Sequence, residues 1–239
     1  MDRKLLPSVR ETYTDQYSLV EQPGYGLRLL EEYRGLYTAA LAQIGGSSGI
    51  VLGVTSPMPR EGKTTVATNV AGALAADLEK QVLLTSCAFS SGDTAAEGQH
   101  VRPGLADYVN EPDRDLDDLL VRTPLPNLSV LFPGIRPDNP SRLLRSDRMR
   151  EAITGFRQRF DITVVDLMPM LSASDSQVMA ALMDGIVLVV GLGDTPIGAV
   201  QRAVRMMPAG RLVGIAANRA QPILPPWLTR LVGGSEWAA

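Results

Sequence analysis

The stretch of residues 54–65 reads VTSPMPREGKTT. Its end, GKT at 62–64, matches the last part of the phosphate-binding pattern G-x-x-x-x-G-K-[ST]. Its beginning differs, because Pro57 stands where that pattern has its first glycine. A β-branched apolar run, 50–55, precedes the loop, and a helical pattern, 64–79, follows it. A helix N-terminus after a strand offers unpaired N–H groups to phosphate oxygens, so we predict a nucleotide site here.

Short apolar runs and helical patterns alternate along the rest of the chain. We predict strands at 50–55, 81–85, 128–132, 162–166, 185–191 and 211–218. We predict helices at 26–44, 64–79, 105–110, 115–122, 140–160, 174–183 and 197–207. This alternation predicts an α/β fold, with a mostly parallel sheet flanked by helices, of the P-loop NTPase kind. Ligands of such folds bind at the carboxyl ends of the strands.

The composition divides the chain into three parts. Residues 1–44 form an N-terminal extension that ends in a helix, and residues 45–220 form the P-loop nucleotide-binding domain. Residues 221–239 form a C-terminal tail punctuated by proline and glycine. Trp227 and Leu231 in this tail suit either contact with a partner or membrane surface, or packing on the domain.

Composition and charge argue against several functions. Hydrophobic residues make up 45% of the 239 residues, charged residues make up 21%, and the net charge of −3 gives no case for nucleic-acid binding. The single cysteine, Cys87, and single histidine, His100, argue against a Cys/His zinc site, and one cysteine fits a reducing compartment. The N-terminus lacks the apolar core of a signal peptide, and the most apolar run, 185–193, is too short to span a bilayer. We therefore predict a cytoplasmic protein.

An aspartate ends one of the predicted strands. Asp166 follows the apolar residues ITVV at 162–165, which is the position of an aspartate that helps to hold Mg²⁺. In this arrangement Lys63 reaches the β- and γ-phosphates, and the Thr64 hydroxyl binds the metal ion. The sequence therefore predicts that Lys63, Thr64 and Asp166 lie together.

The loop resembles that of the bacterial tyrosine kinases that accompany capsule and exopolysaccharide chain-length regulators. The family pattern TS-x-x-P-G-E-G-K-[ST]-T lacks the first glycine too, and it is matched by Thr55, Ser56, Pro59, Glu61, Gly62, Lys63, Thr64 and Thr65. The likeness covers roughly residues 26–220 and includes the family-specific NPSRLL at 139–144. These kinases are relatives of the MinD/ParA ATPases, which implies the MinD/ParA-like form of the fold.

The resemblance implies a site for ATP and Mg²⁺. The implied nucleotide-binding residues are Pro59, Arg60, Glu61, Gly62, Lys63, Thr64, Thr65 and Asn218, of which Asn218 would read the adenine. The implied catalytic residues are Lys63 and Asp166, and the implied metal ligands are Thr64, Asp166 and Ser86. The implied partner is the cytoplasmic segment of an inner-membrane polysaccharide co-polymerase, which would hold the protein peripherally at that membrane. A homo-oligomer is also implied.

The second strand departs from the family pattern at its end. Ser86 and Ala88 occupy the positions of two aspartates that ligate Mg²⁺ and activate the attacking hydroxyl. Loss of a positioned general base costs about 10²–10⁴-fold in rate. The C-terminal tyrosine cluster of the family is also missing, which leaves Tyr13 and Tyr17 as the plausible flexible acceptors.

Three further positions depart from the patterns of the family or its relatives. Arg60 replaces a glycine, so it either strains a left-handed backbone by about 1–3 kcal/mol or contacts phosphate through its guanidinium. The ring-forming E-x-x-R-x-x-R motif ends in Tyr37 rather than arginine, which argues against a family-style ring. Met58 stands at the position of the signature lysine of MinD and ParA.

We expect an ATP-binding regulator of capsule or exopolysaccharide assembly with weak or lost kinase activity. The alternatives are an active tyrosine autokinase and a non-catalytic scaffold or pseudokinase.

Overall fold

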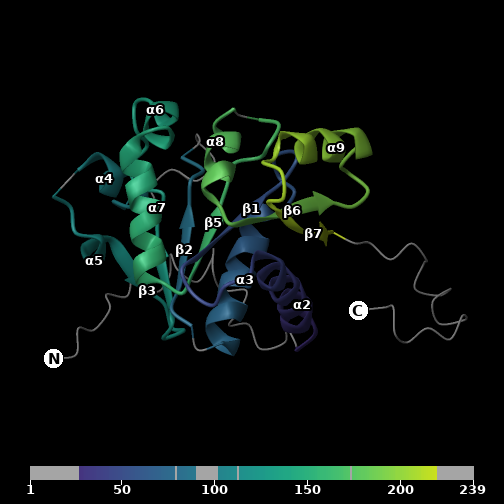
Figure 1. The fold of residues 1–239 in the computed structure, drawn as a ribbon, viewed down its shortest axis with the longest axis horizontal. Coiled ribbons are helices and arrows are strands. Elements are labelled where there is room, and N and C mark those ends of the chain that lie inside the picture. The colour runs from purple at the N-terminus through teal and green to yellow at the C-terminus, as the bar shows by residue number, and fades with distance from the viewer. Residues whose placement is uncertain (1–26, 79, 90–101, 112, 173, 220–239) are drawn as a thin grey trace, which may run out of the picture.

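A computed structural model describes residues 27–78, 80–89, 102–111, 113–172 and 174–219 of the chain (Figure 1). These residues contain a seven-stranded sheet in the order β3-β4-β2-β5-β1-β6-β7. The strands are β1 (Ile50–Thr55), β2 (Val82–Ser86), β3 (Leu120–Arg122), β4 (Leu128–Leu131), β5 (Ile162–Asp166), β6 (Gly185–Gly191) and β7 (Leu212–Asn218). All neighbouring pairs are parallel except β3 and β4. The predicted α/β fold is therefore confirmed.

Helices cover both faces of the sheet (Figure 1). One face packs against α2 (Leu27–Ile44) and α3 (Lys63–Asp77). The opposite face packs against α4 (Leu105–Asn110), α5 (Leu116–Leu119), α6 (Pro140–Leu144), α7 (Asp147–Arg159), α8 (Asp175–Leu182) and α9 (Ile197–Met206). Side chains alternate between the two faces along each strand. In β1, Val51 joins the core on the α4–α9 side, whereas Leu52 and Val54 join the core beneath α2 and α3.

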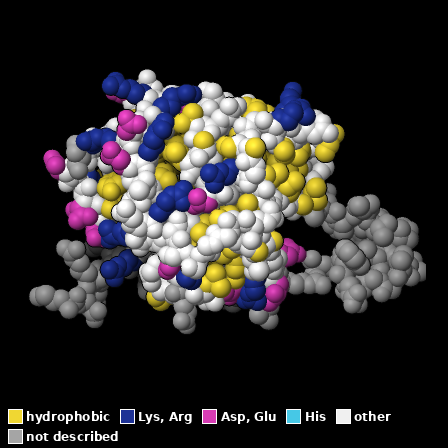
Figure 2. All heavy atoms as spheres, viewed as in Figure 1, with side chains coloured by type: hydrophobic (Ala, Val, Ile, Leu, Met, Phe, Trp, Pro, Cys, Tyr) yellow, Lys and Arg dark blue, Asp and Glu magenta, His cyan; other side chains and the backbone are white. Residues whose placement is uncertain are grey.

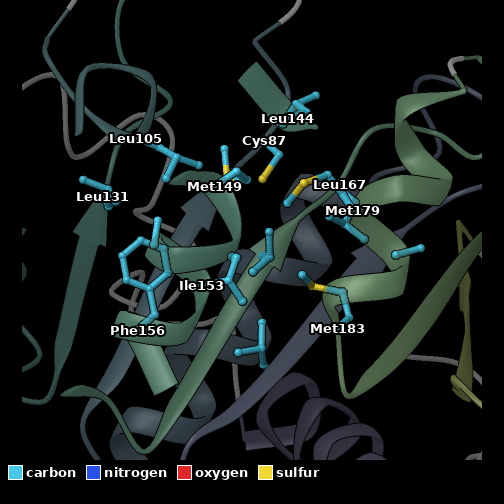
Figure 3. Packing of buried hydrophobic residues seen from close by; sticks show 14 of the residues in the cluster. Cys87, Leu105, Leu131, Leu144, Met149, Ile153, Phe156, Leu167, Met179 and Met183 are labelled. Atoms are coloured by element: carbon cyan, nitrogen blue, oxygen red, sulfur yellow. The ribbon is translucent and has the colours of Figure 1, made fainter. Parts of the chain in front are cut away.

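The core on the α4–α9 side is built mainly from long aliphatic, methionine and phenylalanine side chains. Figure 3 shows Met149, Ile153 and Phe156 along one side of α7, which their spacing of three and four residues allows. They pack in one cluster with Leu131 of β4 and with Leu167, which follows β5. This packing holds α7 against the strands whose carboxyl ends form the site described below.

Two predicted helices are wrong in part. The predicted helix at 140–160 is divided into α6 and α7, because the Ser146 side chain caps a new helix by accepting a hydrogen bond from the Met149 N–H at 3.1 Å. The predicted helix at 115–122 ends after Leu119, and residues 120–122 instead pair with β4 as an edge strand. Its apolar residues satisfy either pattern, so tertiary pairing decides between them.

The described surface carries charges of both signs. Figure 2 shows basic and acidic side chains interspersed over α4, α5 and α7, where Arg159 pairs with Asp117 and Arg114 pairs with Glu111 at 2.9 Å. Hydrophobic side chains gather over α9, at whose start Ile197 is 73% exposed. Among the described residues, none of the helices combines the length and the hydropathy that crossing a bilayer requires.

A polar cluster fastens α2 to α3. The Arg34 guanidinium donates to both carboxylate oxygens of Asp77, at 2.8 and 2.9 Å, and it also contacts Glu31. The Tyr37 hydroxyl donates to the same carboxylate at 2.9 Å, and its ring is buried in the core. Tyr37, which stands at the last arginine of the E-x-x-R-x-x-R motif, thus contributes to packing within this chain. The hydrogen bond from Arg34, opposed by desolvation, lowers the pKa of Asp77 below its ordinary value.

We predict that Asp77→Asn lowers the free energy of unfolding at pH 7 by about 1 kcal/mol, since the charged partner of Arg34 is lost. Because the folded pKa of Asp77 is depressed, its contribution is present above the unfolded pKa of about 3.9 and is lost as the pH falls through the lower folded value. Urea unfolding at pH 7 and near pH 3 measures the difference from the unmodified protein, which should shrink at the lower pH. A control, Asp138→Asn at an exposed aspartate, should change little at either pH; an Asp77→Asn effect independent of pH would contradict the prediction.

Candidate nucleotide-binding site

The P-loop connects the carboxyl end of β1 to the N-terminus of α3, as the sequence predicts. Gly62 is the residue before the first turn of α3, and its φ of 87° lies in the left-handed region that favours glycine. A Cβ at this position would collide with the side-chain amide nitrogen of Asn218. Both the backbone conformation and the close approach therefore require glycine here.

Lys63, Thr64 and Asp166 lie together at the carboxyl edge of the sheet. The Lys63 ammonium is 3.3 Å from Asp166 Oδ1, and the Thr64 hydroxyl donates to Asp166 Oδ2 at 2.8 Å. Lys63 Nζ is also 3.3 Å from Thr64 Oγ1. The structure thus places side by side the three residues that the sequence predicts as the centre of the site.

Asp166 is a buried carboxylate with only 4% of its surface exposed. Burial raises its pKa above the ordinary value, while the charge of Lys63 and the hydrogen bond from Thr64 act in the opposite direction. Within the described part of the chain, Oδ1 pairs with the Lys63 ammonium at 3.3 Å and has no other hydrogen-bond partner. A buried carboxylate oxygen with spare acceptor capacity, beside a threonine hydroxyl, fits a hard cation such as Mg²⁺ or one of its water ligands.

Ser86 lies at the edge of this cluster. Its hydroxyl is 3.4 Å from Asp166 Oδ2 and accepts a hydrogen bond from the Ala88 N–H at 3.2 Å. The β2–β5 register pairs Ser86 directly with Asp166, so an aspartate at residue 86 would bring a second carboxylate to this place. Across the described ranges, no group of three or more His, Cys, Asp or Glu side chains could hold a metal ion. The polar groups around Asp166 are accordingly hydroxyls and an ammonium.

Arg60 adopts a φ of 67°, so its backbone lies in the left-handed region. This agrees with the first of the two expectations for Arg60, that the residue strains the backbone. For a residue with a Cβ, this left-handed conformation costs of order 1–3 kcal/mol. The Arg60 carbonyl accepts a hydrogen bond from the Arg219 guanidinium at 2.5 Å. Contact between the Arg60 side chain and phosphate stays a prediction.

Glu61 is buried within the loop and acts as an internal acceptor. One carboxylate oxygen accepts from the Met58 N–H at 2.6 Å, and the other accepts from the Thr195 hydroxyl. The Ser56 hydroxyl donates to the Met58 carbonyl at 2.7 Å and closes the beginning of the loop. The beginning of the loop, where the general pattern has its first glycine, is thus held by side-chain hydrogen bonds.

The remaining predicted residues fall at different distances from this centre. Pro59 is exposed in the loop and Thr65 is exposed on the first turn of α3. Asn218 lies against the loop, where its amide donates to the Glu61 carbonyl at 2.9 Å. Sequence reasoning missed Thr195 and Arg219, because their link to the loop depends on tertiary contacts and no local motif marks it.

The described tyrosines are engaged in packing. Tyr37 is buried, the Tyr33 hydroxyl accepts from Asn69 at 3.3 Å, and Tyr108 stacks on Phe156 with ring centroids 6.2 Å apart. The predicted acceptors Tyr13 and Tyr17 lie outside the described residues.

The fold and this loop define a P-loop nucleotide-binding protein, and comparison with known proteins gives its family. The chain is 30% identical over 182 residues to the tyrosine-protein kinase CpsD of Streptococcus agalactiae, covering 74% of this chain and 78% of that protein. The chain therefore belongs to the CpsD-like family of bacterial tyrosine kinases. No protein-family model matches the chain.

Other relatives are longer. The chain is 28% identical over 196 residues to EpsB of Ralstonia nicotianae and 28% identical over 193 residues to the succinoglycan biosynthesis transport protein ExoP of Rhizobium meliloti. These alignments cover 81% and 79% of this chain but only 26% and 25% of the relatives. The chain thus spans about a quarter of the length of these two proteins.

Solved structures agree with the fold. The kinase domain of VpsO superposes with a TM-score of 0.69 at 28% identity, over 82% of this chain and 97% of that domain. A ParA family ATPase from Chlorobium tepidum superposes with a TM-score of 0.55 at 18% identity, over 79% and 81% of the two chains, which concerns the fold alone. The predicted ParA-like form of the fold is thereby confirmed.

Replacing Arg60 with glycine tests the cost of the left-handed backbone. We predict that Arg60→Gly raises the free energy of unfolding by about 1 kcal/mol, because glycine adopts this φ without a steric penalty. Arg60→Ala keeps the backbone penalty and removes the guanidinium, so it should give no gain. Urea denaturation of the three proteins measures the difference, and an equal gain in Arg60→Ala would mean that the side chain, not the backbone, is responsible.

Proposed function

We propose that this protein binds ATP with Mg²⁺ at the P-loop and regulates polysaccharide assembly. The observation that carries the proposal is the cluster of Lys63, Thr64 and Asp166 at the N-terminus of α3, in which Asp166 Oδ1 is buried and, among the described residues, has only the Lys63 ammonium as a partner. Each group matches one requirement of a phosphate–metal site, namely a cation, a hydroxyl and a carboxylate. CpsD and other kinases of the family support this proposal by their similarity.

In this proposal the residues of the chain have separate roles. The N–H groups at the start of α3 and the Lys63 ammonium hold the phosphates, and Gly62 lets the backbone approach them. Thr64 and Asp166 hold Mg²⁺, with Ser86 close enough to bind a water ligand of the ion. When bound, the metal ion neutralises charge on the phosphate oxygens.

We propose further that phosphoryl transfer is weak or lost. Among the described residues, Asp166 supplies the carboxylate of the cluster, and in this proposal it holds Mg²⁺ beside Lys63 and Thr64 rather than acting as a base. Ser86 and Ala88 stand at the end of β2, and neither side chain can act as a carboxylate base. An ATP-dependent regulatory subunit then fits the site better than an efficient kinase.

The names of the relatives suggest the pathway in which the protein acts and the kind of partner that it binds. ExoP is named a succinoglycan biosynthesis transport protein, and this supports a role for the present chain in exopolysaccharide or capsule assembly. We propose that the chain acts at the cytoplasmic side of the inner membrane, bound to the cytoplasmic segment of a polysaccharide co-polymerase. An active autokinase with Tyr13 or Tyr17 as acceptor is the second candidate, and family membership favours it.

Nucleotide binding at the loop is tested by Lys63→Ala. We predict that saturating Mg-ATP raises the melting temperature of the unmodified protein by about 5–10 °C, and that Lys63→Ala abolishes this shift. The ligand-induced shift is the relevant quantity, because the substitution also leaves Asp166 without its cation. Lys80→Ala is the matched control, since Lys80 precedes β2 and lies at the opposite edge of the sheet; an undiminished shift in Lys63→Ala would remove the loop from nucleotide binding.

Catalysis is tested by incubating the purified protein with Mg-ATP, alone and with the cytoplasmic segment of the co-polymerase. ADP release and intact protein mass are followed together. We expect slow ADP release without added mass, because Ser86 and Ala88 at the end of β2 offer no carboxylate base to a tyrosine hydroxyl. A gain of one phosphate that maps to Tyr13 or Tyr17 would instead establish an active autokinase, and a protein with neither signal but a normal ATP-induced melting shift would be a non-catalytic scaffold.

A further inference from the structure

Asn218, the last residue of β7, uses both ends of its side-chain amide within the protein. Nδ2 donates to the Glu61 carbonyl at 2.9 Å, and Oδ1 accepts from the Arg219 N–H at 2.9 Å. A residue that reads a base must offer such groups to the base. In this structure one N–H of the Asn218 amide is directed at the backbone of the P-loop.

This hydrogen bond acts on one particular peptide group. The Glu61 carbonyl and the Gly62 N–H belong to the same planar peptide unit, so holding the carbonyl also sets the direction of the N–H. The Asn218 side chain lies so close to Gly62 that it would exclude a Cβ there. Because Gly62 has a φ of 87° and directly precedes α3, the orientation of this peptide decides how the first N–H groups of the site are presented.

Neighbouring contacts hold the preceding part of the loop in the same way. The Arg219 guanidinium donates to the Arg60 carbonyl at 2.5 Å and to Asp194 at 3.2 Å. The Thr195 hydroxyl donates to the Glu61 carboxylate. Two left-handed residues, Arg60 and Gly62, are thus held by side chains from the end of β7 and from the segment after β6. Surrounding contacts of this kind are what maintain a strained backbone.

We infer that Asn218 is a positioning residue for the phosphates, which acts through the peptide between Glu61 and Gly62. This inference rests on the proposed function, that the loop binds Mg-ATP. Asn218 accordingly contributes to the binding of any polyphosphate, with or without a base.

The test compares three probes, Mg-ATP, Mg-GTP and magnesium tripolyphosphate, by calorimetric titration of the full chain. Asn218→Asp keeps the shape of the side chain and the acceptor for Arg219, but it removes the donor that the Glu61 carbonyl needs. We expect the variant to bind all three probes about 5–10-fold more weakly, the loss of roughly one hydrogen bond, with the ATP-to-GTP ratio unchanged. Asn218→Ala removes the donor without adding charge and should behave alike. Asn127→Asp, at the opposite edge of the sheet, should leave all three affinities unchanged.

Amide hydrogen exchange of residues 57–66 without ligand gives a second readout that needs no nucleotide. The inference predicts faster exchange at this loop in Asn218→Asp and Asn218→Ala, and normal exchange in Asn127→Asp. It is overturned if the variants lose ATP but keep tripolyphosphate, since Asn218 then reads the base, or if loop exchange stays unchanged. If the unmodified protein bound none of the three probes, the proposed function would fail, and hydrogen exchange alone would decide whether Asn218 holds the loop.

Discussion

The ion pair between Lys63 and Asp166 is the interaction on which the site depends. Asp166 ends the central strand β5, and its register places it beside Val54 of β1 and Ser86 of β2. A carboxylate buried at this depth is costly unless a cation and hydrogen bonds compensate it. Lys63 and Thr64 supply that compensation from the first turn of α3. The P-loop is thereby drawn toward the end of β5, and the same groups are available to phosphate and metal.

The loop differs from the general P-loop in how it is held. This chain places Pro57 where the general pattern has its first glycine and Arg60 where the family pattern has a glycine, and side chains supply the constraints. The Glu61 carboxylate joins Met58 to Thr195, and the end of β7 holds two successive carbonyls of the loop. The conformation of the loop therefore depends on contacts with residues at the carboxyl ends of several strands. This arrangement explains how a non-glycine residue keeps a positive φ at Arg60.

Much of the fold follows from local pattern. The strands at 50–55, 162–166 and 185–191 lie where the apolar runs predict them, because a strand covered on both faces is apolar throughout. The errors arise where local pattern is ambiguous. Residues 120–122 fit a helix or a strand equally, and they become a strand because β4 offers an edge. The helix at 140–160 is divided because the Ser146 side chain caps α7, and the apolar spacing on either side of Ser146 does not show this division.

The class of site can be predicted from the sequence, since the loop, the residue that ends β5 and the alternation of elements are local features. The sequence also shows that the end of β2 carries Ser86 and Ala88 rather than carboxylates, which is a matter of residue identity. Only the tertiary structure decided how these parts cooperate. It placed Thr195, Asn218 and Arg219 against a loop more than 130 residues earlier in the chain. Such contacts depend on the order of strands in the sheet, and hydrogen bonds between distant segments leave no periodicity in the sequence.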